Sequence, residues 1–323
     1  MLPILSGCIA SSINPALTGM NLWLDGNDTS RITKIYQNIT PTGTGTSGTH
    51  TITASATMAN LAFIGNKIRI GGTDIYTISA ISTVTITTVE TLTATYSAGS
   101  ALALDKESQI LDKSGHSNNA ANATVDQQPT YIPAIKNNKG FMGFDGINDA
   151  LTVTTSSSID DIFANGGTYI YVINPRNAGG GGNARIFDKT SSSLFVSNFA
   201  ANLGDISLFQ GTTGTGWQWS AAGLLNQNNY NIIIVTYNAS TVSTAPHIYI
   251  NSKTAASLVV SISGTGSALS NSGINYILGN RADLARAFNG SIGVAQAWKY
   301  VFSATQVTQA MNYYSDFYNI AVT

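Results

Sequence analysis

Acidic side chains are the residues most able to do chemistry in this chain, and their spacing argues against catalysis. Hydrolysis of a glycosidic bond needs two carboxyl groups facing one groove, ~5 Å apart in retaining enzymes and wider around a water in inverting ones. The sequence contains two glutamates, Glu90 and Glu107, and neither belongs to the Glu-x-Asp-x-x-Glu pattern of glucanases. Asp160 and Asp161 are adjacent, so on a strand their side chains would point to opposite faces. We therefore expect a protein that is not an enzyme.

Histidine, cysteine and glycine patterns indicate no active site either. His50, His116 and His247 stand in unrelated contexts and no Gly-x-Ser-x-Gly elbow accompanies them. A hydrolytic triad assembled from distant residues stays open at this stage. Zinc sites use paired Cys or His ligands at short spacing, and the chain has one cysteine, Cys8. The glycine run 179–182 lacks the Gly-Lys-Ser/Thr ending of a phosphate loop.

Two tryptophans are the best candidate for a ligand-binding surface. Trp217, Gln218 and Trp219 follow a Gly/Thr-rich segment, and strand alternation puts both tryptophans on one face. Aromatic rings displayed beside amides can stack on the face of a pyranose. Tryptophans at period two also commonly face a sheet interior. Two alternatives therefore remain for the tryptophans, an exposed carbohydrate-binding platform and a buried pair, and the sequence favours the buried pair.

Composition limits the partners. Only 10% of residues are charged and the net charge is -1, so no basic stripe can neutralise phosphates and we expect no nucleic-acid partner. No apolar run approaches the ~20 residues that span a bilayer, so we expect no membrane partner. The segment before Cys8 is too short and lacks the cationic residues of a secretion signal. A surface rich in Thr, Ser and Asn suits lateral packing or neutral ligands, or simply an all-β protein with many turns.

Strand-like windows separated by Gly, Asn, Ser and Asp clusters recur along the chain and predict an all-β fold. Many short strands with turn residues between them are typical of a sandwich or barrel rather than of βαβ units. The windows are 168–173, 184–187, 193–196, 231–237, 247–250, 257–262, 276–278 and 291–298.

One helix is predicted near the C-terminus. Ser303, with Gln306 three residues on, forms a capping box. Apolar residues then recur at helical spacing, and they are Val307, Ala310, Met311, Tyr314 and Tyr318. We expect this stripe to pack against the sandwich, because such stripes are core far more often than ligand surfaces.

Residues 34–105 form a segment distinct from its surroundings, and this segment interrupts the motif that starts at Trp23. The segment that starts at Trp23 ends at Ile32, and its natural continuation begins at Ser108. Between them, residues alternate between apolar and polar at 49–53, 67–70 and 84–88, which predicts strands with one buried face. The same stretch contains the apolar segment 61–64, a tight turn at 71–72 and the segment 76–81. We expect an inserted small β domain over 34–105 that is marginally stable alone.

The two host segments, 21–33 and 106–323, resemble the concanavalin A-like jelly roll of the laminin G type. Four ordered motifs carry the resemblance: Trp23, Leu24, Asp25 and Asp28; then Asp112, Ser114, Gly115 and Ala120; then Phe144, Asp145, Gly146 and Asp149; then Gly290, Ile292 and 295–298. One departure is Ile110 or Leu111 where the family usually carries Trp, which affects packing rather than chemistry. The resemblance implies a concanavalin A-like β-sandwich (jelly roll) with an inserted small β-barrel domain and a short C-terminal helix.

The resemblance to laminin G domains also suggests one candidate cofactor, calcium. Laminin G relatives often hold this ion at a rim of the sandwich, and calcium takes six to eight oxygen ligands. Asp145, Asn148 and Asp149 form a compact oxygen-rich turn, and a second such turn spans 25–28. Asp and Asn also cap turns by hydrogen-bonding their own backbone two residues on. We favour capping and keep calcium as the alternative.

The insert is similar to a short β-barrel repeat common in tailed-phage virion proteins. Its core, 64–78, follows a Gly-Thr-Gly-Thr turn within 42–48. Fold resemblance alone does not fix a function, but the two modules together imply a non-enzymatic phage virion structural protein: a capsid decoration or cement, a head fibre or a tail-associated adhesive component, located in the virion. The implied partners are other virion proteins, contacted through an anchoring segment 1–20 and the insert, host surface glycans, and further copies of the chain in a homo-oligomer. The alternative is a carbohydrate-binding module or adhesin at a cell surface.

Overall fold

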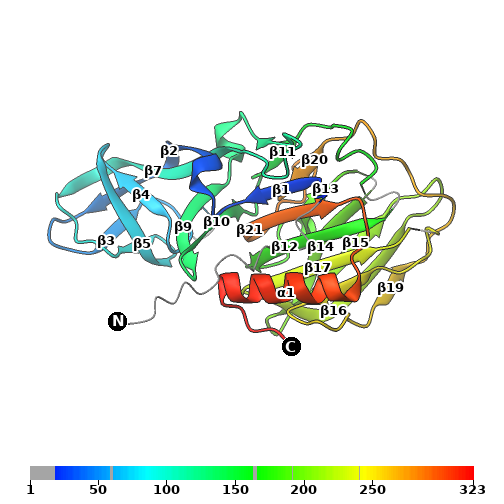
Figure 1. Cartoon of the computed structure of the whole chain (residues 1–323). Coiled ribbons are helices and arrows are strands. Elements are labelled where there is room, and N and C mark those ends of the chain that lie inside the picture. The colour runs from blue at the N-terminus through cyan, green and yellow to red at the C-terminus, as the bar shows by residue number, and fades with distance from the viewer. Residues whose placement is uncertain (1–18, 59–60, 163–165, 191, 240) are drawn as a thin grey trace, which may run out of the picture.

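The computed structural model describes residues 19–323 except 59–60, 163–165, 191 and 240. Over these residues, the fold is an all-β sandwich with a closed six-stranded barrel at one end and one α-helix near the C-terminus, which confirms the predicted fold class (Figure 1). The predicted anchoring segment 1–20 lies, up to residue 18, outside the described residues. Within them, no helix has the length and apolar character needed to cross a membrane.

Two antiparallel layers form the sandwich. The first contains β9 (Thr130–Lys136), β10 (Lys139–Asp145), β1 (Leu22–Asp25), β21 (Asn289–Trp298), β12 (Gly167–Pro175), β17 (Asn231–Tyr237) and β18 (His247–Ile250). The second contains β8 (Ala120–Ala121), β11 (Leu151–Val153), β20 (Tyr276–Leu278), β13 (Asn183–Asp188), β14 (Ser192–Ala200), β15 (Leu203–Gln210), β16 (Trp217–Asn226) and β19 (Val259–Ile262). Short 3-10 helices η2 (Thr29–Arg31), η3 (Val125–Gln127) and η4 (Gly180–Gly182) lie in the connections.

Aromatic residues fill the space between the two layers. Strand alternation sends Tyr169, Tyr171 and Ile173 of β12 into this core. Phe187 of β13 stacks between Tyr171 and Tyr276, with ring centroids 5.9 and 5.4 Å away. The hydroxyls of these two tyrosines share a hydrogen bond of 2.8 Å, which satisfies polar groups that would otherwise be costly to bury.

Helix α1 (Ala304–Tyr318) covers the outer face of the first layer and makes a third layer (Figure 1). The predicted capping box is confirmed: the Ser303 hydroxyl accepts from the Gln306 backbone N–H, and the Gln306 side chain accepts from the Ser303 backbone N–H. The buried residues of α1 are the five of the predicted stripe. They pack on Ile170, Ile232 and Val294, the outward side chains of β12, β17 and β21.

The barrel closes through six consecutive antiparallel pairings. Its strands are, in order around the barrel, β2 (Ile32–Gly45), β3 (Thr51–Ala54), β6 (Thr85–Thr88), β5 (Asp74–Ser82), β4 (Lys67–Ile70) and β7 (Tyr96–Ile110), which returns to β2. Alternate residues point inward to a core separate from that of the sandwich. Residues 61–64 form a turn.

That turn docks the barrel on the sandwich. Phe63 leaves the barrel and packs in the cluster beneath α1, and the Arg176 guanidinium lies 3.5 Å from its ring centroid. The Asn66 amide donates to the Tyr131 carbonyl at 2.7 Å and its oxygen accepts from the Phe63 N–H at 2.6 Å. This segment therefore serves a contact between the two modules rather than the barrel sheet.

Candidate functional site

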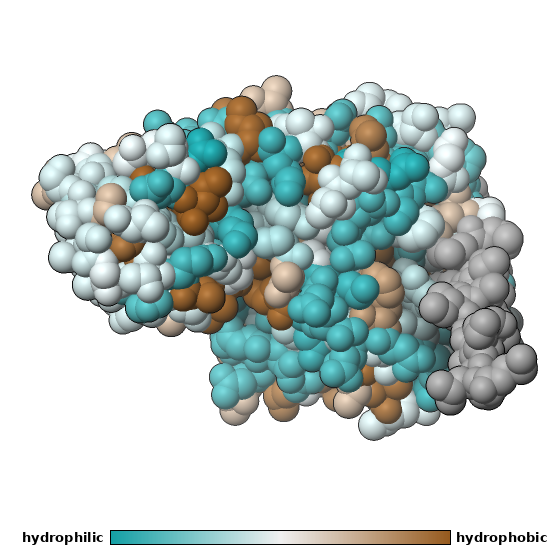
Figure 2. All heavy atoms as spheres, turned by 60° about the vertical axis from the view of Figure 1, so that its left-hand side comes forward, coloured by the Kyte–Doolittle hydropathy of each residue, from teal (hydrophilic) through white to brown (hydrophobic). Residues whose placement is uncertain are grey.

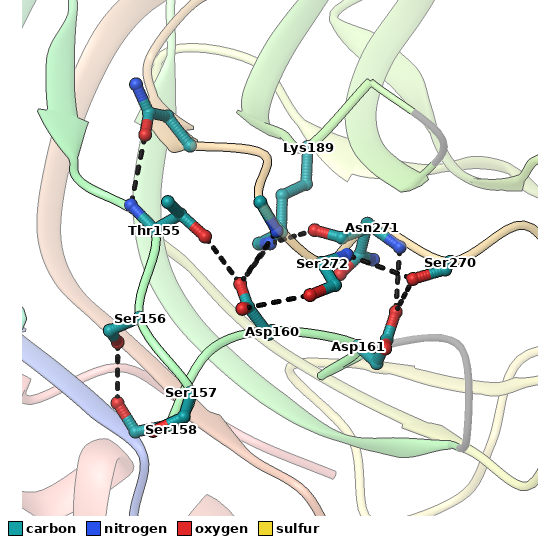
Figure 3. A network of polar contacts seen from close by, with 12 residues as sticks. Thr155, Ser156, Ser157, Ser158, Asp160, Asp161, Lys189, Ser270, Asn271 and Ser272 are labelled. Atoms are coloured by element: carbon teal, nitrogen blue, oxygen red, sulfur yellow. Dashed lines mark hydrogen bonds and ion pairs between the residues drawn. The ribbon is translucent and has the colours of Figure 1, made fainter.

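A polar pocket of about 450 Å³ opens beside the turn that precedes β12. The turn carries Asp160 and Asp161, and the segment 270–273 before β20 faces it (Figure 3). The lining residues are Ser157, Asp160, Asp161, Gly166, Ser272 and Lys299. The pocket therefore combines segments that are more than 100 residues apart in sequence.

Asp160 is held by hydrogen bonds and by a buried cation. Its carboxylate accepts from the Thr155 hydroxyl at 2.5 Å, the Ser272 hydroxyl at 3.1 Å and the Gly273 N–H at 3.3 Å. Lys189 Nζ lies 3.7 Å from Asp160 Oδ1. Burial by itself raises the pKa of Asp160, but these hydrogen bonds and Lys189 outweigh it and lower the pKa below its usual value. A carboxylate this acidic is ionised at neutral pH and cannot serve as a general acid.

Asp161 sits in left-handed backbone with φ 52°, a conformation that Asp tolerates better than most residues. Its Oδ1 accepts from the Ser270 hydroxyl at 2.7 Å and from the Asn271 N–H at 2.8 Å. The two adjacent aspartates thus reach the same segment, 270–273. The argument that adjacent side chains point to opposite faces holds for a strand and does not apply here, because the structure has a turn.

Lys189 is the counter-charge beneath the pocket. Its side chain is fully buried, and its ammonium donates to the Asn271 carbonyl at 2.6 Å. Burial lowers its pKa, while Asp160 and Asp161 oppose that change. The ammonium therefore ties β13 to the segment 270–273 and fixes the Asp160 carboxylate from below.

Ser157 and a second lysine, Lys299, also line the pocket, and hydrogen bonds fix the serines on either side of Ser157. Ser156 donates to Asn118 Oδ1 at 2.7 Å, and the Asn118 amide donates to the Ser158 hydroxyl at 2.8 Å. At the mouth, Lys299 Nζ donates to the Ser157 carbonyl at 2.7 Å. The pocket thus presents fixed carboxylate acceptors, hydroxyls and an ammonium donor, which is chemistry suited to binding hydroxyl groups rather than breaking bonds.

The predicted tryptophan site lies elsewhere, and one of its members is core. Trp219 is 1% exposed and contacts Tyr237, so its inclusion as a ligand-binding residue was wrong: no sugar could reach the ring. Trp217 stacks on it with centroids 5.6 Å apart and planes 9° apart, and Trp217 Nε1 is buried. Gln218 is half-buried. A ligand-binding role for Trp217 and Gln218 stays a prediction.

The predicted calcium turn is occupied by its own hydrogen bonds. Asp145 Oδ1 accepts from the N–H groups of Ile147 and Asn148 at 2.8 and 3.2 Å, and Asp149 Oδ2 accepts from the Asp145 N–H at 2.9 Å. Asp149 Oδ1 lies 3.6 Å from Lys106 Nζ. Among the described residues, no group of three or more His, Cys, Asp or Glu side chains is placed to hold a metal. These bonds match turn capping, and calcium stays a prediction.

Sequence reasoning missed Lys189 and the segment 270–273. Asn and Ser are frequent throughout the chain, so that segment carried no distinguishing signal. Asp160–Asp161 was the one available signal, and it was considered only for the case of a strand. Sequence reasoning also missed that Asp105 and Glu107 lie near each other. They share one face of β7, and both are buried at the junction of barrel and sandwich.

Comparison with known proteins finds distant structural likeness alone. No protein-family model matches the chain, and no curated protein sequence matches it. Among solved structures, the chain is similar to the binding domain of Paraclostridial Mosquitocidal Protein 1, with a TM-score of 0.47, 14% identity and coverage of 64% of this chain and 49% of that one. The chain therefore spans about half the length of that relative.

Two further structures carry sugars in their names. One is domain 4 of AbnA, an arabinanase from Geobacillus stearothermophilus, in complex with arabinotriose (TM-score 0.40, 12% identity, coverage 61% and 90%). The other is the CBM40 of Ruminococcus gnavus IT-sialidase bound to alpha2,3 sialyllactose (TM-score 0.34, 13% identity, coverage 46% and 84%). Likenesses this distant identify neither a ligand nor a site in this chain.

Proposed function

We propose that the chain is a non-enzymatic binding protein that takes a neutral carbohydrate into the pocket at Asp160 and Asp161. The observation that carries the proposal is the pair of fixed carboxylates beside serine hydroxyls and Lys299 in one open pocket. Charge supports a neutral ligand, since two carboxylates are matched by the ammonium groups of Lys189 and Lys299. Hydrogen bonds from sugar hydroxyls to charged acceptors contribute about 1.5–3 kcal/mol each.

A glycan array with the whole chain, followed by calorimetry on the best hit, tests this function. Asp160→Asn should weaken binding at least about tenfold, because it removes a charged acceptor. Asp316→Asn, an exposed acid on α1, is the matched control and should bind like the wild type. Ser272→Ala leaves the Lys189–Asp160 pair intact and should weaken binding in the same direction if Asp160→Asn folds poorly. A wild-type chain that binds no glycan would reject the function.

A second candidate is the virion structural role that the resemblance implies, with lateral contacts between copies of the chain. The observation that favours it is β19, an edge strand on which Val259, Val260 and Ile262 are 56%, 49% and 39% exposed. Residues 254–280 contain no charged side chain, whereas natural edge strands usually carry charges that block pairing. Mass spectrometry of purified particles, with copy number relative to the shell protein, tests this role. Absence from the particles would end it.

A further inference from the structure

A second pocket, of about 340 Å³, lies on the outer surface of the barrel, far from the Asp160 pocket in the chain. Its lining includes Tyr36 and Asn38 of β2, Arg69 of β4, the Gly71–Gly72 turn and Ala103 of β7. Ala103 pairs with Asn38 on one side and with Arg69 on the other. A small outward residue between two large ones leaves a hollow with Ala103 as its floor.

Arg69 is the one charged group in this lining, and its hydrogen-bonding capacity is unused. The guanidinium lies flat against Tyr36, with Cζ 4.2 Å from the ring centroid, a stacking that holds the side chain in place. Its Nε is buried and has no hydrogen-bond partner among the described residues, where Arg69 also makes no ion pair. The buried Nε costs about 1–3 kcal/mol. The terminal amino groups of the guanidinium, which make no hydrogen bond to the described residues either, are the donors that a ligand in the pocket can reach.

The charges around Arg69 fit an anion of single charge. Lys34 Nζ lies 3.8 Å from Asp105 Oδ2, so Asp105 is already matched by one cation. Burial raises the pKa of Asp105, and both Lys34 and Arg69 act against that rise. Arg69 is therefore the excess positive charge, and the nearby Asp105 disfavours a dianion such as phosphate. A carboxylate matches the planar fork of a guanidinium and carries one negative charge.

We propose that this pocket binds the carboxylate of an acidic side chain on a partner protein, through Arg69. The open turn beside the pocket supports a protein ligand: a Cβ built at Gly72 would meet no atom within 4 Å, so another backbone can approach closely. Figure 2, in which the barrel end comes forward, shows that end mostly in pale residues of intermediate hydropathy, with brown and teal patches between them. On such a surface one specific ion pair contributes more to selectivity than it would among many charges.

Titration of the whole chain with acetyl-Gly-Glu-Gly-amide and acetyl-Gly-Gln-Gly-amide, followed by the NMR signal of arginine Nε–Hε groups, tests the proposal. The glutamate peptide should shift the Arg69 signal in a saturable way and bind at least about tenfold more tightly than the glutamine peptide. Arg69→Gln should abolish the binding. Lys67→Gln is the matched control, because Lys67 lies two residues away on the same strand and already contacts Thr77 and Glu90.

Three results would overturn the proposal: equal shifts with both peptides, binding that survives Arg69→Gln in a chain that melts like the wild type, or loss of binding in Lys67→Gln equal to that in Arg69→Gln. A separate acetate titration identifies the source of the carboxylate. Acetate that binds as tightly as the glutamate peptide would overturn the assignment to a protein partner. Weaker acetate binding supports it.

Discussion

Glu107 is a fully buried carboxyl group at the junction of barrel and sandwich. Neither of its oxygens has a hydrogen-bond partner among the described residues. Burial raises its pKa well above the usual value, the charges of Asp105 and Asp149 add to that rise, and Lys34 opposes it. Because ionisation is so unfavourable there, Glu107 lowers the free energy of unfolding as the pH rises. It is buried, so it is not a catalytic acid open to substrate.

Glu107→Gln should raise the free energy of unfolding at pH 8 and change it little at pH 4. An unfolded glutamate ionises near pH 4.3. Between that pH and the higher folded-state pKa the native chain holds the extra proton, so stability is lost as pH rises. Replacing the group with a neutral amide of the same shape removes the loss, at about 1.4 kcal/mol per pKa unit. Urea unfolding at pH 4, 6 and 8 measures the effect.

Glu90→Gln is the control of opposite sign. Burial alone would raise the pKa of Glu90, but hydrogen bonds from Thr77 and the charge of Lys67 lower it overall. Its stabilising contribution is present above the unfolded pKa and lost in acid, so this substitution should destabilise slightly at pH 8 and not at pH 3. A gain from Glu107→Gln that is constant with pH would contradict the assignment.

Trp219 should prove structural. Trp219→Ala should cost about 3–5 kcal/mol of unfolding free energy, because a fully buried ring leaves a cavity between the layers. Trp217→Ala should cost less, since Trp217 is partly exposed. Urea denaturation of both variants checks the order. Loss of glycan binding in a Trp219→Ala chain that keeps its stability would show that the ring acts on a ligand instead.

At the scale of an element, the capping box of α1 should carry measurable energy. Ser303→Ala removes the hydroxyl that accepts from the Gln306 N–H and should cost about 1 kcal/mol. Thr305→Ala, at an exposed position of the same first turn, should change stability by less than about 0.5 kcal/mol. Urea midpoints for the two variants give the comparison. Equal losses would mean that helix propensity, not the cap, governs this end.

At the scale of the whole molecule, barrel and sandwich have separate cores. Tyr36 and Asp105 pair across β2 and β7, so an Asn-Gly turn joining them can replace residues 37–104 as a tight hairpin. The shortened chain should fold, melt at a lower temperature because Phe63 and Asn66 no longer support the sandwich, and bind glycan at Asp160 as before. Circular dichroism and calorimetry test this. A chain without a cooperative transition would mean that the sandwich needs the barrel.

Local signals in the sequence determined much of the fold. Strand-like windows at 168–173, 231–237 and 291–298 lie within β12, β17 and β21, and the capping box begins α1 where predicted. These signals depend on neighbours a few residues apart, where side-chain direction follows the backbone alone. Strands β9, β10 and β15 gave no such window, although β9–β10 and β14–β15 are hairpins of consecutive strands.

The candidate site was decided by tertiary structure. Asp160 and Asp161 meet Lys189 and the segment 270–273 because β13 and β20 are neighbours in the second layer, and no pattern within ten residues of either aspartate encodes that meeting. The exposure of the two tryptophans was decided in the same way: alternation placed both on one face, and the opposing layer then buried Trp219 and left Trp217 partly exposed. Residue spacing determines the face of a strand to which a side chain points, whereas the burial of that side chain depends on which other elements pack against the face.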